Sequence, residues 1–460
     1  MLLSNWQRDG GVGGTLAEEC AIADGYVNAK EVAASIIQAG LSALQPSSFC
    51  GRQIEYDGQR LVVAGRSYDL DQFDRVIVLA VGKASPQIVH FLEGLLGERL
   101  SGGISVVREA DAEASTNRIT TLVSDHPLPS ERSVYAAGRL LQAASSCTER
   151  DIVMAVITGG SSALACLPGF GVSLASKRQL HKDLLASGAR IQDVNSVRKH
   201  LSAIKGGRLA LAGSSATWIN LTVSDVVDDQ LDCITDLTVT DGSTKSDAIR
   251  VLETYGLAQS LPSDIKRALK AAPETNPLLS DIDIHTTILA SGLTAATAMR
   301  HAAETMGFKA IMMGARVEGE ARSVGSLLGS LATESGLTGS PFPRHSVLIG
   351  AGGEATVALP DVSTHGGPNQ EVALAFANSL RHDVDVAGMF IDSDGLDGPT
   401  EFAGGLVDNQ TGEKLANAGV DAAQALIEHR ATTALSAVGD VVRLGSTGTN
   451  VSDLFTIVIA

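Results

Sequence analysis

Short apolar runs that end in glycine or polar residues recur along the chain and restrict its fold more than any other feature. The clearest is the run from Asp151 to Thr158, which reads DIVMAVIT and is apolar on both faces of the expected strand. Strands of this kind occur in sheets that are covered on both sides, and such sheets are mostly parallel. Segments with helical spacing separate successive runs, so the sequence predicts parallel sheets with helices on both faces.

The alternation continues through both halves of the 460 residues, which are too many for one hydrophobic core. We expect two α/β domains with mostly parallel sheets, the first of them Rossmann-like, and an active-site cleft between them. The predicted division is a flexible tail over residues 1–26, an N-terminal domain over 27–260 and a C-terminal domain over 261–460. A high glycine count of 48 with only 4% aromatic residues suits the strand-to-helix turns of this architecture.

Charge and composition limit the partners of the chain. A net charge of -17 argues against nucleic-acid binding, because release of counterions needs a basic surface. No apolar run approaches the roughly 20 residues of a membrane span, and the first residues lead us to expect no signal peptide. The five cysteines form no CxxC pair, as is typical of reduced packing residues. We therefore expect a cytoplasmic protein with small-molecule ligands and no nucleic-acid or membrane partner; a homodimer stays an open option.

A glycine- and serine-rich turn follows the first run directly. Gly159, Gly160, Ser161 and Ser162 connect the expected strand to a helical segment. Backbone N–H groups at such a turn favour an anion. The alternative is a plain tight turn, but two glycines and two serines exceed what that turn needs. We expect all four residues to bind substrate or phosphate.

A cluster of cations comes next, within an acidic chain. Asn195, Arg198, Ser202 and Lys205 are spaced by three or four, which places them on one face of a helix predicted from about Asp193 to Ile204. A polar helix face is often merely solvated. Because Arg198 and Lys205 follow the glycine turn closely, we expect both to act in catalysis and Asn195 to bind substrate.

Other expected strands also end in polar residues, where ligands of parallel sheets bind. Lys83 follows a buried run at Gly82 and is placed for a phosphoryl group, although a solvated lysine is the alternative. His126 is as consistent with a structural histidine as with substrate binding. Asp225 is predicted to hold Mg²⁺ together with phosphate oxygens, with a helix cap as the alternative.

The second half of the chain has its own polar loops between expected strands and helices. The loop DSDGLDG resembles a calcium site, but Gly395 stands fourth and not sixth, so that interpretation fails. The predicted nucleotide-binding residues of these loops are Glu354, Asn369, Glu371, Asp394, Thr447, Thr449 and Asn450.

Longer motifs resemble the class II glycerate kinases, also called glycerate 2-kinases. The N-terminal motifs are AVGKAS, SDHPLPSE, ITGGSSALACLP, SGARIQDVNSVRKHLSAIKGGRLA and SDVV; the C-terminal ones are GGEATV, GGPNQEVALA, DSDGLDGPTEFAGG and STGTNVSDL. The resemblance covers nearly everything from Val27 to the end. It implies ATP-dependent phosphorylation of D-glycerate to 2-phosphoglycerate with Mg²⁺, with Lys83 at the position of the catalytic lysine.

The chain departs from this family pattern at two loops. Pro368 stands where the family often has Arg, and Thr235-Asp236-Leu237-Thr238 replaces an SGPT-type loop. The expected activity is phosphorylation of glycerate or a related hydroxy or sugar acid, with Lys83, Arg198 and Lys205 at the transferring phosphate and substrate carboxylate. Asp225 is then metal ligand or base. The alternatives are a non-kinase relative that binds a sugar-acid phosphate and a hydroxypyruvate reductase, for which no dinucleotide fingerprint is present.

Overall fold

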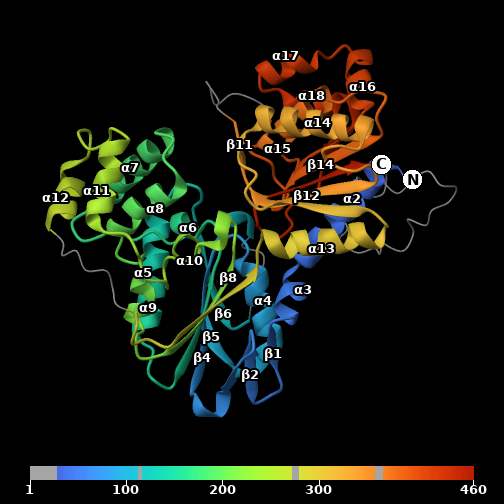
Figure 1. Cartoon of the computed structure of the whole chain (residues 1–460). Helices are drawn as coiled ribbons and strands as arrows, with labels where there is room; N and C mark the ends of the chain where they lie inside the picture. The colour runs from blue at the N-terminus through green and yellow to red at the C-terminus, as the bar shows by residue number, and fades with distance from the viewer. Residues whose placement is uncertain (1–27, 112–116, 272–278, 358–365) are drawn as a thin grey trace. The chain divides into compact units, whose positions relative to one another are not determined.

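The computed structural model describes residues 28–460 except 112–116, 272–278 and 358–365 (Figure 1). These residues form two compact units, each with its own sheet. The N-terminal unit comprises Phe49–Ser224 and Asp229–Leu289, and the C-terminal unit comprises the residues up to Ser48, Asp225–Asp228 and Ala290–Ala460. The predicted organisation as two α/β units is confirmed. The predicted tail over residues 1–26 lies outside the described residues.

The N-terminal unit is built on a six-stranded sheet with the order β6-β5-β4-β7-β8-β9. The strands are β4 (Arg75–Val81), β5 (Leu100–Arg108), β6 (Ile119–Ser124), β7 (Asp151–Ile157), β8 (Thr217–Val223) and β9 (Ile284–Ala290). All pairs from β6 to β8 are parallel. Every residue of β7 is buried, as its apolar run predicts for a central strand covered on both faces.

Helices and a small antiparallel sheet complete this unit. The helices are α4 (Ser85–Leu96), α5 (Glu131–Ser145), α6 (Ser161–Leu164), α7 (Leu174–Ala186), α8 (Ile191–His200), α9 (Arg208–Ala212), α10 (Leu231–Ile234), α11 (Lys245–Thr254) and α12 (Ser263–Ala271). The small sheet contains β1 (Ile54–Tyr56), β2 (Arg60–Val63) and β3 (Arg66–Asp69). Helices α7, α8, α11 and α12 share a separate apolar core and form a helical group of their own (Figure 1).

The sheet of the C-terminal unit has the order β10-β12-β17-β14-β15-β16. The strands are β10 (Lys309–Gly314), β12 (Ser346–Gly353), β14 (Val386–Asp392), β15 (Gly404–Asp408), β16 (Val441–Val442) and β17 (Asp453–Ile459). Only β10 and β12 are parallel within it, so this sheet is mixed and the prediction of a mostly parallel one is wrong. The connection from β14 to β15 contains no crossover helix, and a short connection joins antiparallel neighbours.

Helices surround the C-terminal sheet, and a two-stranded parallel ladder lies beside it. The helices are α2 (Ala29–Ala43), α13 (Gly292–Thr305), α14 (Ala321–Thr338), α15 (Pro368–Asn378), α16 (Thr411–Asn417), α17 (Ala422–Ile427) and α18 (Ala431–Val438), with the short α3 (Pro46–Gly51) after α2. The ladder pairs β11 (Gly319–Glu320) with β13 (Ala355–Thr356). The central α15 is buried along its length and packs on α14.

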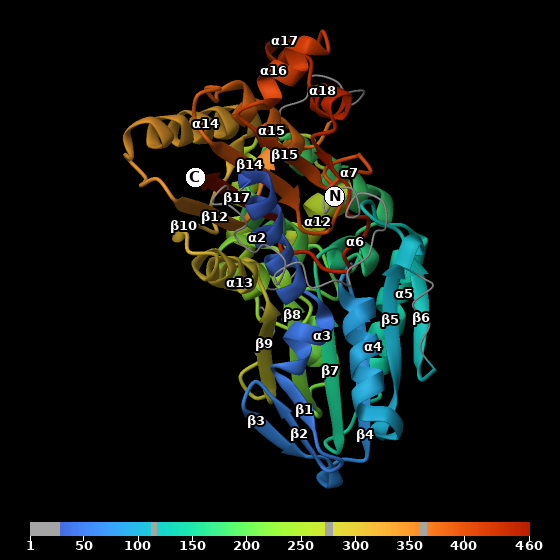
Figure 2. The same cartoon turned by 90° about the vertical axis from the view of Figure 1, so that its right-hand side faces the viewer.

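The division of the chain differs from the predicted boundaries at two places. Helix α2 was expected in the N-terminal domain, but it packs on α13 and on β14 and β17 of the C-terminal unit (Figure 2). Gly40 permits this approach, because a Cβ there would lie 2.8 Å from Met299 Cγ. The N-terminal unit also extends to Leu289 and not to 260, because β9 adds an edge strand beside β8.

Two further findings bear on the expected class of protein. Among the described residues, no helix combines the length and the apolar character that crossing a membrane requires. Cys50, Cys147, Cys166 and Cys233 are all free thiols, whereas Cys20 lies outside the described residues.

Candidate active site

The carboxyl ends of β4 and β7 meet where the strand order of the N-terminal sheet reverses. Strands β5 and β6 follow β4 on one side, and β7 and β8 continue on the other. Such a switch point is where open α/β sheets bind ligands. There the amide of Lys83 donates to the carbonyl of Gly159 at 2.8 Å, and that of Thr158 donates to Val81 at 3.0 Å. The structure thus brings together two of the predicted site residues from different strands.

Two glycines allow these strand ends to approach closely. Gly82 has a φ of 132°, and a Cβ there would lie 2.1 Å from Thr158 Oγ1. Gly160 has a φ of 87°, and a Cβ there would meet the ring of His126 at 3.2 Å and Lys83 Cγ at 3.3 Å. Lys83, His126 and Gly160 therefore form one cluster from three strand ends, which we call the Lys83 cluster.

The turn at Gly160 is followed by a very short helix. It leads into α6, a helix of only four residues, in which the Ser161 amide donates to Thr158 O at 3.3 Å. Ser161 is buried and Ser162 is partly exposed. Ser162 Oγ accepts a hydrogen bond from Lys205 Nζ at 2.7 Å. The turn thus contacts a side chain of the expected cation cluster.

The cations do not share one long helix, which corrects the prediction for Asp193 to Ile204. Helix α8 ends at His200, and Ser202 instead pairs with Pro168 in an isolated antiparallel bridge. Asn195 and Arg198 stay on the helix, while Lys205 lies in the turn before α9. Just after the helix, the carbonyl of Leu201 accepts hydrogen bonds from Gly169 N at 2.9 Å and from Lys177 Nζ at 3.0 Å.

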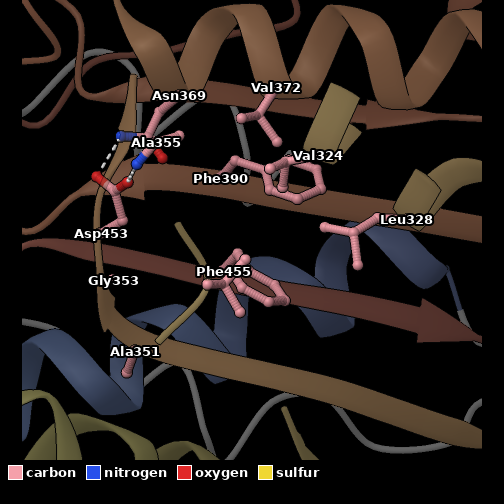
Figure 3. Close-up of a pocket in the computed structure, with 11 residues that line it drawn as sticks. Val324, Leu328, Ala351, Gly353, Ala355, Asn369, Val372, Phe390, Asp453 and Phe455 are labelled. Atoms are coloured by element: carbon pink, nitrogen blue, oxygen red, sulfur yellow. Dashed lines mark hydrogen bonds between the residues drawn. The ribbon is translucent and has the colours of Figure 1, made fainter. Parts of the chain in front are cut away.

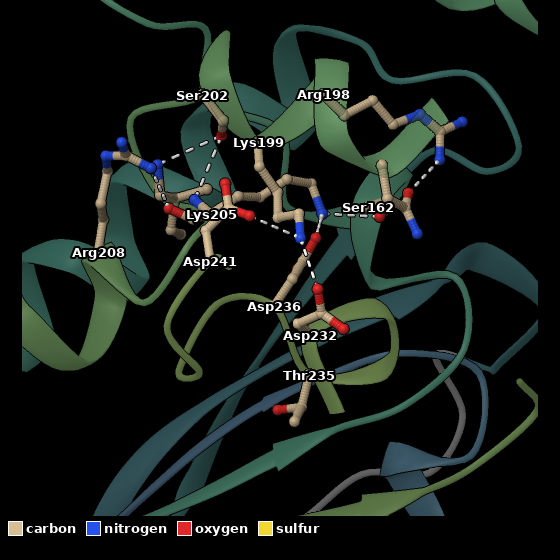
Figure 4. A network of polar contacts seen from close by, with 12 residues as sticks. Ser162, Arg198, Lys199, Ser202, Lys205, Arg208, Asp232, Thr235, Asp236 and Asp241 are labelled. Atoms are coloured by element: carbon tan, nitrogen blue, oxygen red, sulfur yellow. Dashed lines mark hydrogen bonds and ion pairs between the residues drawn. The ribbon is translucent and has the colours of Figure 1, made fainter. Parts of the chain in front are cut away.

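Lys205 forms a buried ion pair. Its Nζ lies 2.6 Å from Asp236 Oδ2, and both side chains are 2% exposed (Figure 4). The second contact of this ammonium is Ser162 Oγ. Asp236 belongs to one of the two loops in which the chain departs from the family pattern. The charge of Lys205 is therefore balanced within the protein.

Arg198 has neutral partners. Its Nε donates to His181 Nδ1 at 2.9 Å and its Nη1 donates to Asn195 Oδ1 at 3.3 Å. Burial and the nearby cations lower the pKa of His181 to about 4, so the imidazole is neutral and accepts. Burial lowers the pKa of Arg198 to about 10, which leaves it charged at neutral pH. Within the described part of the chain, no carboxylate lies at ion-pair distance from this guanidinium.

Two further cations near this group were not among the predicted site residues. Lys177 Nζ donates to the carbonyls of Leu201 at 3.0 Å and Leu167 at 3.4 Å, and burial lowers its pKa to about 8. The spacing of Lys177 and His181 by four places both on one face of α7, and this pattern was the signal available. Lys199 by contrast bridges Asp232 at 3.0 Å and Asp241 at 2.9 Å.

Asp225 lies two residues after the end of β8, and residues Asp225–Asp228 group with the C-terminal unit. Its Oδ2 accepts from Asn450 Nδ2 at 3.4 Å, and its carbonyl accepts from Ser452 Oγ at 2.8 Å. The sequence placed it beside the Gly159 turn. The two hydrogen bonds connect it to the loop before β17.

Four predicted nucleotide-binding residues come together in that loop and in the loop after β14. Thr447 donates from Oγ1 to Ser393 O at 2.6 Å and from its amide to Asp394 O at 3.2 Å. Val451 N donates to Ser393 Oγ at 2.8 Å. Thr449 and Asn450 lie in the same turn. These contacts join Asp394 to Thr447, Thr449 and Asn450, which lie more than 50 residues further along the chain, in one group.

A second group surrounds Asn369 at the start of α15. Its Nδ2 donates to Asp453 Oδ1 at 2.6 Å (Figure 3). The same nitrogen lies 3.4 Å from Asp397 Oδ1. Glu354 is exposed beside Ala355, whose amide donates to Asp453 Oδ2 at 2.9 Å. Asn369 and Asp453 form the polar end of a small cavity. Its apolar lining consists of Val317, Val324, Leu328, Ala351, Gly353, Ala355, Val372, Phe390 and Phe455.

The carboxylates of this region have unusual proton affinities. Burial is the first cause and raises the pKa of Asp392 to about 8, of Asp453 to about 7 and of Asp397 to about 6. Neighbouring carboxylates raise those of Asp392 and Asp453 further. Such groups favour a nearby cation or proton. Asp453 was not predicted from the sequence, although it lies inside the STGTNVSDL motif.

Glu371, another predicted nucleotide-binding residue, contacts different side chains from those of these two groups. Its carboxylate is 3.1 Å from His429 Nδ1 and 3.3 Å from Arg322 Nε, and its side chain is 2% exposed. Burial raises its pKa. The glutamate thus ties α15 to the turn between α17 and α18.

No group of three or more histidine, cysteine, aspartate or glutamate side chains among the described residues is arranged to hold a metal ion. Any divalent cation would need ligands from water or from a bound substrate as well as from the protein.

Two family models match the chain. The domain of unknown function DUF4147 matches residues 32–270, and the MOFRL family matches residues 347–453.

Similar proteins include glycerate kinases, one of them with a crystal structure, and a protein named as a reductase. A glycerate 2-kinase of Pyrococcus horikoshii is 34% identical over 94% of this chain and 97% of its own length. A putative hydroxypyruvate reductase of Agrobacterium vitis is 35% identical over 84% and 87%. The crystal structure of a glycerate kinase from Thermotoga maritima superposes with a TM-score of 0.81 at 31% identity, over 94% of this chain and 99% of that one.

Proposed function

The chain belongs to the class II glycerate kinase family, and from this premise we propose that it transfers the γ-phosphoryl group of ATP to a hydroxyl of D-glycerate or a close hydroxy acid. One observation supports this function most: cations from separate strands and helices gather beside the switch point of the N-terminal sheet. Lys83 lies there at Gly160 and His126, and Arg198 has only neutral partners among the described residues. An anionic substrate would complement the positive charge of this group.

The reaction needs positioning and charge neutralisation more than covalent chemistry. The acceptor oxygen bonds to the γ-phosphorus while the bond from that phosphorus to ADP breaks, and the hydroxyl proton leaves to a base. We assign Lys83 to the transferring phosphoryl group and Arg198 to the substrate carboxylate, which its planar guanidinium can bind in a bidentate manner. Lys205, balanced by Asp236, orients Ser162.

The nucleotide is assigned to the C-terminal unit. Asp394, Thr447, Thr449 and Asn450 offer hydroxyl, amide and carboxylate groups within two neighbouring loops. Asn369 and Glu354 flank them beside Asp453. Glu371 has no part in this proposal, because its carboxylate is already engaged by His429.

Mg²⁺ fits the donors that the chain offers. Mg²⁺ is usually held by one or two carboxylates together with substrate phosphates and water, and Asp225 presents one carboxylate beside the Asn450 amide. When bound, the ion would neutralise phosphate charge. Asp225 would hold it, or serve as the base that accepts the hydroxyl proton.

The name hydroxypyruvate reductase, which some similar proteins carry, describes a different reaction. Reduction of hydroxypyruvate requires a hydride donor. The strand-to-helix turn at Gly82-Lys83 lacks the G-x-G-x-x-G pattern of dinucleotide-binding sheets. We expect no oxidation of NADH or NADPH in the presence of hydroxypyruvate, measured as loss of absorbance.

Release of ADP tests the kinase function directly. We expect ADP formation from ATP with D-glycerate, and Lys83→Ala should lower kcat by at least about 100-fold, because a preorganised charge at the transferring group is lost. Lys182→Ala is the matched control, since Lys182 is exposed on α7. A Lys83→Ala enzyme with near wild-type kcat contradicts the assignment.

A panel of three- to six-carbon hydroxy acids separates the kinase from a binding protein. If no acid supports ADP formation but a sugar-acid phosphate raises the thermal midpoint, the chain binds without turnover. The departures at Pro368 and at the loop from Thr235 to Thr238 make this panel informative.

A further inference from the structure

The loop Thr235-Asp236-Leu237-Thr238 is buried and is fixed by hydrogen bonds to neighbouring segments. All four residues are at most 1% exposed. Thr235 Oγ1 donates to Asn220 Oδ1 at 3.0 Å, and the carbonyls of Asp236 and Leu237 accept from Gly207 and Leu209 at 3.0 and 3.1 Å. The direction of the Asp236 side chain is therefore determined by the fold.

The two oxygens of this carboxylate have different environments. Oδ2 accepts the hydrogen bond from Lys205 Nζ at 2.6 Å. Oδ1 is buried, and it has no hydrogen-bond partner among the described residues. A buried acceptor without a partner costs about 1–3 kcal/mol. Native structures generally satisfy such a group with water, an ion or a ligand.

The surroundings determine which partner fits this oxygen. The neighbouring Lys205 ammonium already has two acceptors, Asp236 Oδ2 and Ser162 Oγ. A second anion is repelled by the carboxylate, so the partner must be a donor. Because the oxygen is buried, a small donor such as a hydroxyl suits it better than a larger group.

The carboxylate lies in the same electrostatic neighbourhood as the proposed anion site. The charge of Asp236 acts on both Arg198 and Lys177, and the three cations Lys177, Arg198 and Lys205 all act on His181. Ser162 and Arg198 at the edge of this group are partly exposed. An acid whose carboxylate binds Arg198 can therefore carry a hydroxyl towards Asp236.

We propose that Asp236 is a specificity-determining residue whose Oδ1 accepts a hydrogen bond from a hydroxyl of the acceptor other than the one that is phosphorylated. This inference rests on the proposed kinase function. The substrate class is a carboxylic acid with at least two hydroxyls. If the 2-hydroxyl of D-glycerate receives the phosphoryl group, its 3-hydroxyl is the one that donates a hydrogen bond to Asp236.

D-Lactate provides the matched probe, because it has the carboxylate and the 2-hydroxyl but lacks the 3-hydroxyl. A site built around a substrate hydroxyl rejects an analogue without it strongly. We expect wild-type kcat/KM for D-glycerate to exceed that for D-lactate by at least about 100-fold. Asp236→Ala should raise KM for D-glycerate and reduce this ratio by at least about tenfold, with D-lactate little changed.

Asp232→Asn is the control variant, since Asp232 lies four residues away on α10 and pairs with Lys199. It should leave the ratio unchanged. If Asp236→Ala does not fold, Asp236→Asn keeps the shape of the side chain, and the same loss of discrimination is expected from it. A merely structural role lowers turnover with both acids in equal proportion, and this outcome overturns the proposal.

Thermal stabilisation by millimolar D-glycerate or D-lactate tests the contact of Asp236 with the hydroxyl separately from the kinase function. Wild-type protein should be stabilised more by D-glycerate, and Asp236→Ala should abolish the difference. If this pattern appears without any ADP release, the hydroxyl contact stands while the kinase function fails. Wild-type protein that uses or binds both acids equally overturns the inference, and the buried oxygen then bonds an enclosed water.

Discussion

Three aspartates of the C-terminal unit hold protons more tightly than a free carboxyl does. The pKa of Asp392 is raised to about 8, that of Asp453 to about 7 and that of Asp397 to about 6, with burial as the first cause in each case. A raised pKa in the folded state means that folding takes up protons above the ordinary pKa near 3.8. The stability from these groups is present at acidic pH and is lost as pH rises through the folded values.

We therefore predict that the thermal midpoint of the protein falls between about pH 5 and pH 8. Asp392→Asn should flatten this decline, because the amide cannot ionise. Differential scanning calorimetry across this pH range measures the thermal midpoint of both proteins. Asp383→Asn is the control, since that carboxylate is exposed and Arg381 lowers its pKa. An unchanged slope in Asp392→Asn contradicts the prediction.

At the same scale, glycines and charged residues next to apolar runs were readable from the sequence, but their partners were not. Lys83 and Gly160 follow expected strands, and the structure brings them to one point. His181 could have been suggested by its spacing from Lys177. Nothing local in the sequence pairs Lys205 with Asp236, which lies 31 residues further along the chain.

Helix α15 begins at a side-chain cap from a distant loop. Asp397 Oδ1 accepts from the amide of Asn369 at 3.0 Å, and its Oδ2 accepts from the amide and the side chain of Gln370 at 2.8 and 3.0 Å. Gly367 makes room, because a Cβ there would lie 2.1 Å from Asp397 Cγ. The cap therefore joins the loop after β14 to the most buried helix of the unit.

We predict that Asp397→Ala lowers the free energy of unfolding by about 2–4 kcal/mol, because several buried donors lose their acceptor. Urea denaturation monitored by circular dichroism measures the change. Asp421→Ala, which removes the single cap bond to Gln424 at the exposed start of α17, should cost about 1 kcal/mol. Equal losses in the two variants would mean that the Asp397 bonds add nothing beyond an ordinary cap.

At the scale of the whole molecule, the chain is not divided into consecutive segments. Helix α2 comes before the N-terminal sheet in sequence but packs in the C-terminal unit through residues such as Val32, Ile36 and Ile37. Its contacts cover α13 and the central strands β14 and β17. The C-terminal unit therefore needs a helix that is encoded at the other end of the chain.

We predict that residues 290–460 alone do not give a cooperative unfolding transition, because removal of α2 exposes the apolar surface that it covers. Linking residues 28–48 to this fragment should restore cooperativity and solubility, measured by circular dichroism melting and size-exclusion chromatography. Ile36→Asp in the linked fragment is the control and should remove the benefit. A fragment 290–460 that melts cooperatively without the helix contradicts the prediction.

The sequence by itself determined the features that depend on neighbouring residues. The alternation of apolar runs and helical segments predicts the parallel N-terminal sheet, and β7 from Asp151 to Ile157 is buried throughout as its composition requires. The glycine turn after it follows from the need for a φ of 87° at Gly160. Local periodicity and backbone geometry act within a few residues, so they can be read directly from a sequence.

Only the tertiary structure decided which distant segments meet. It placed α2 in the C-terminal unit, inserted β17 antiparallel between β12 and β14, bound Glu371 to His429 and paired Lys205 with Asp236. These contacts depend on complementary shape and charge across long stretches of chain, which local patterns do not encode. In the loop that departs from the family pattern, only the tertiary structure pairs Asp236 Oδ2 with Lys205 and leaves Oδ1 without a hydrogen-bond partner among the described residues.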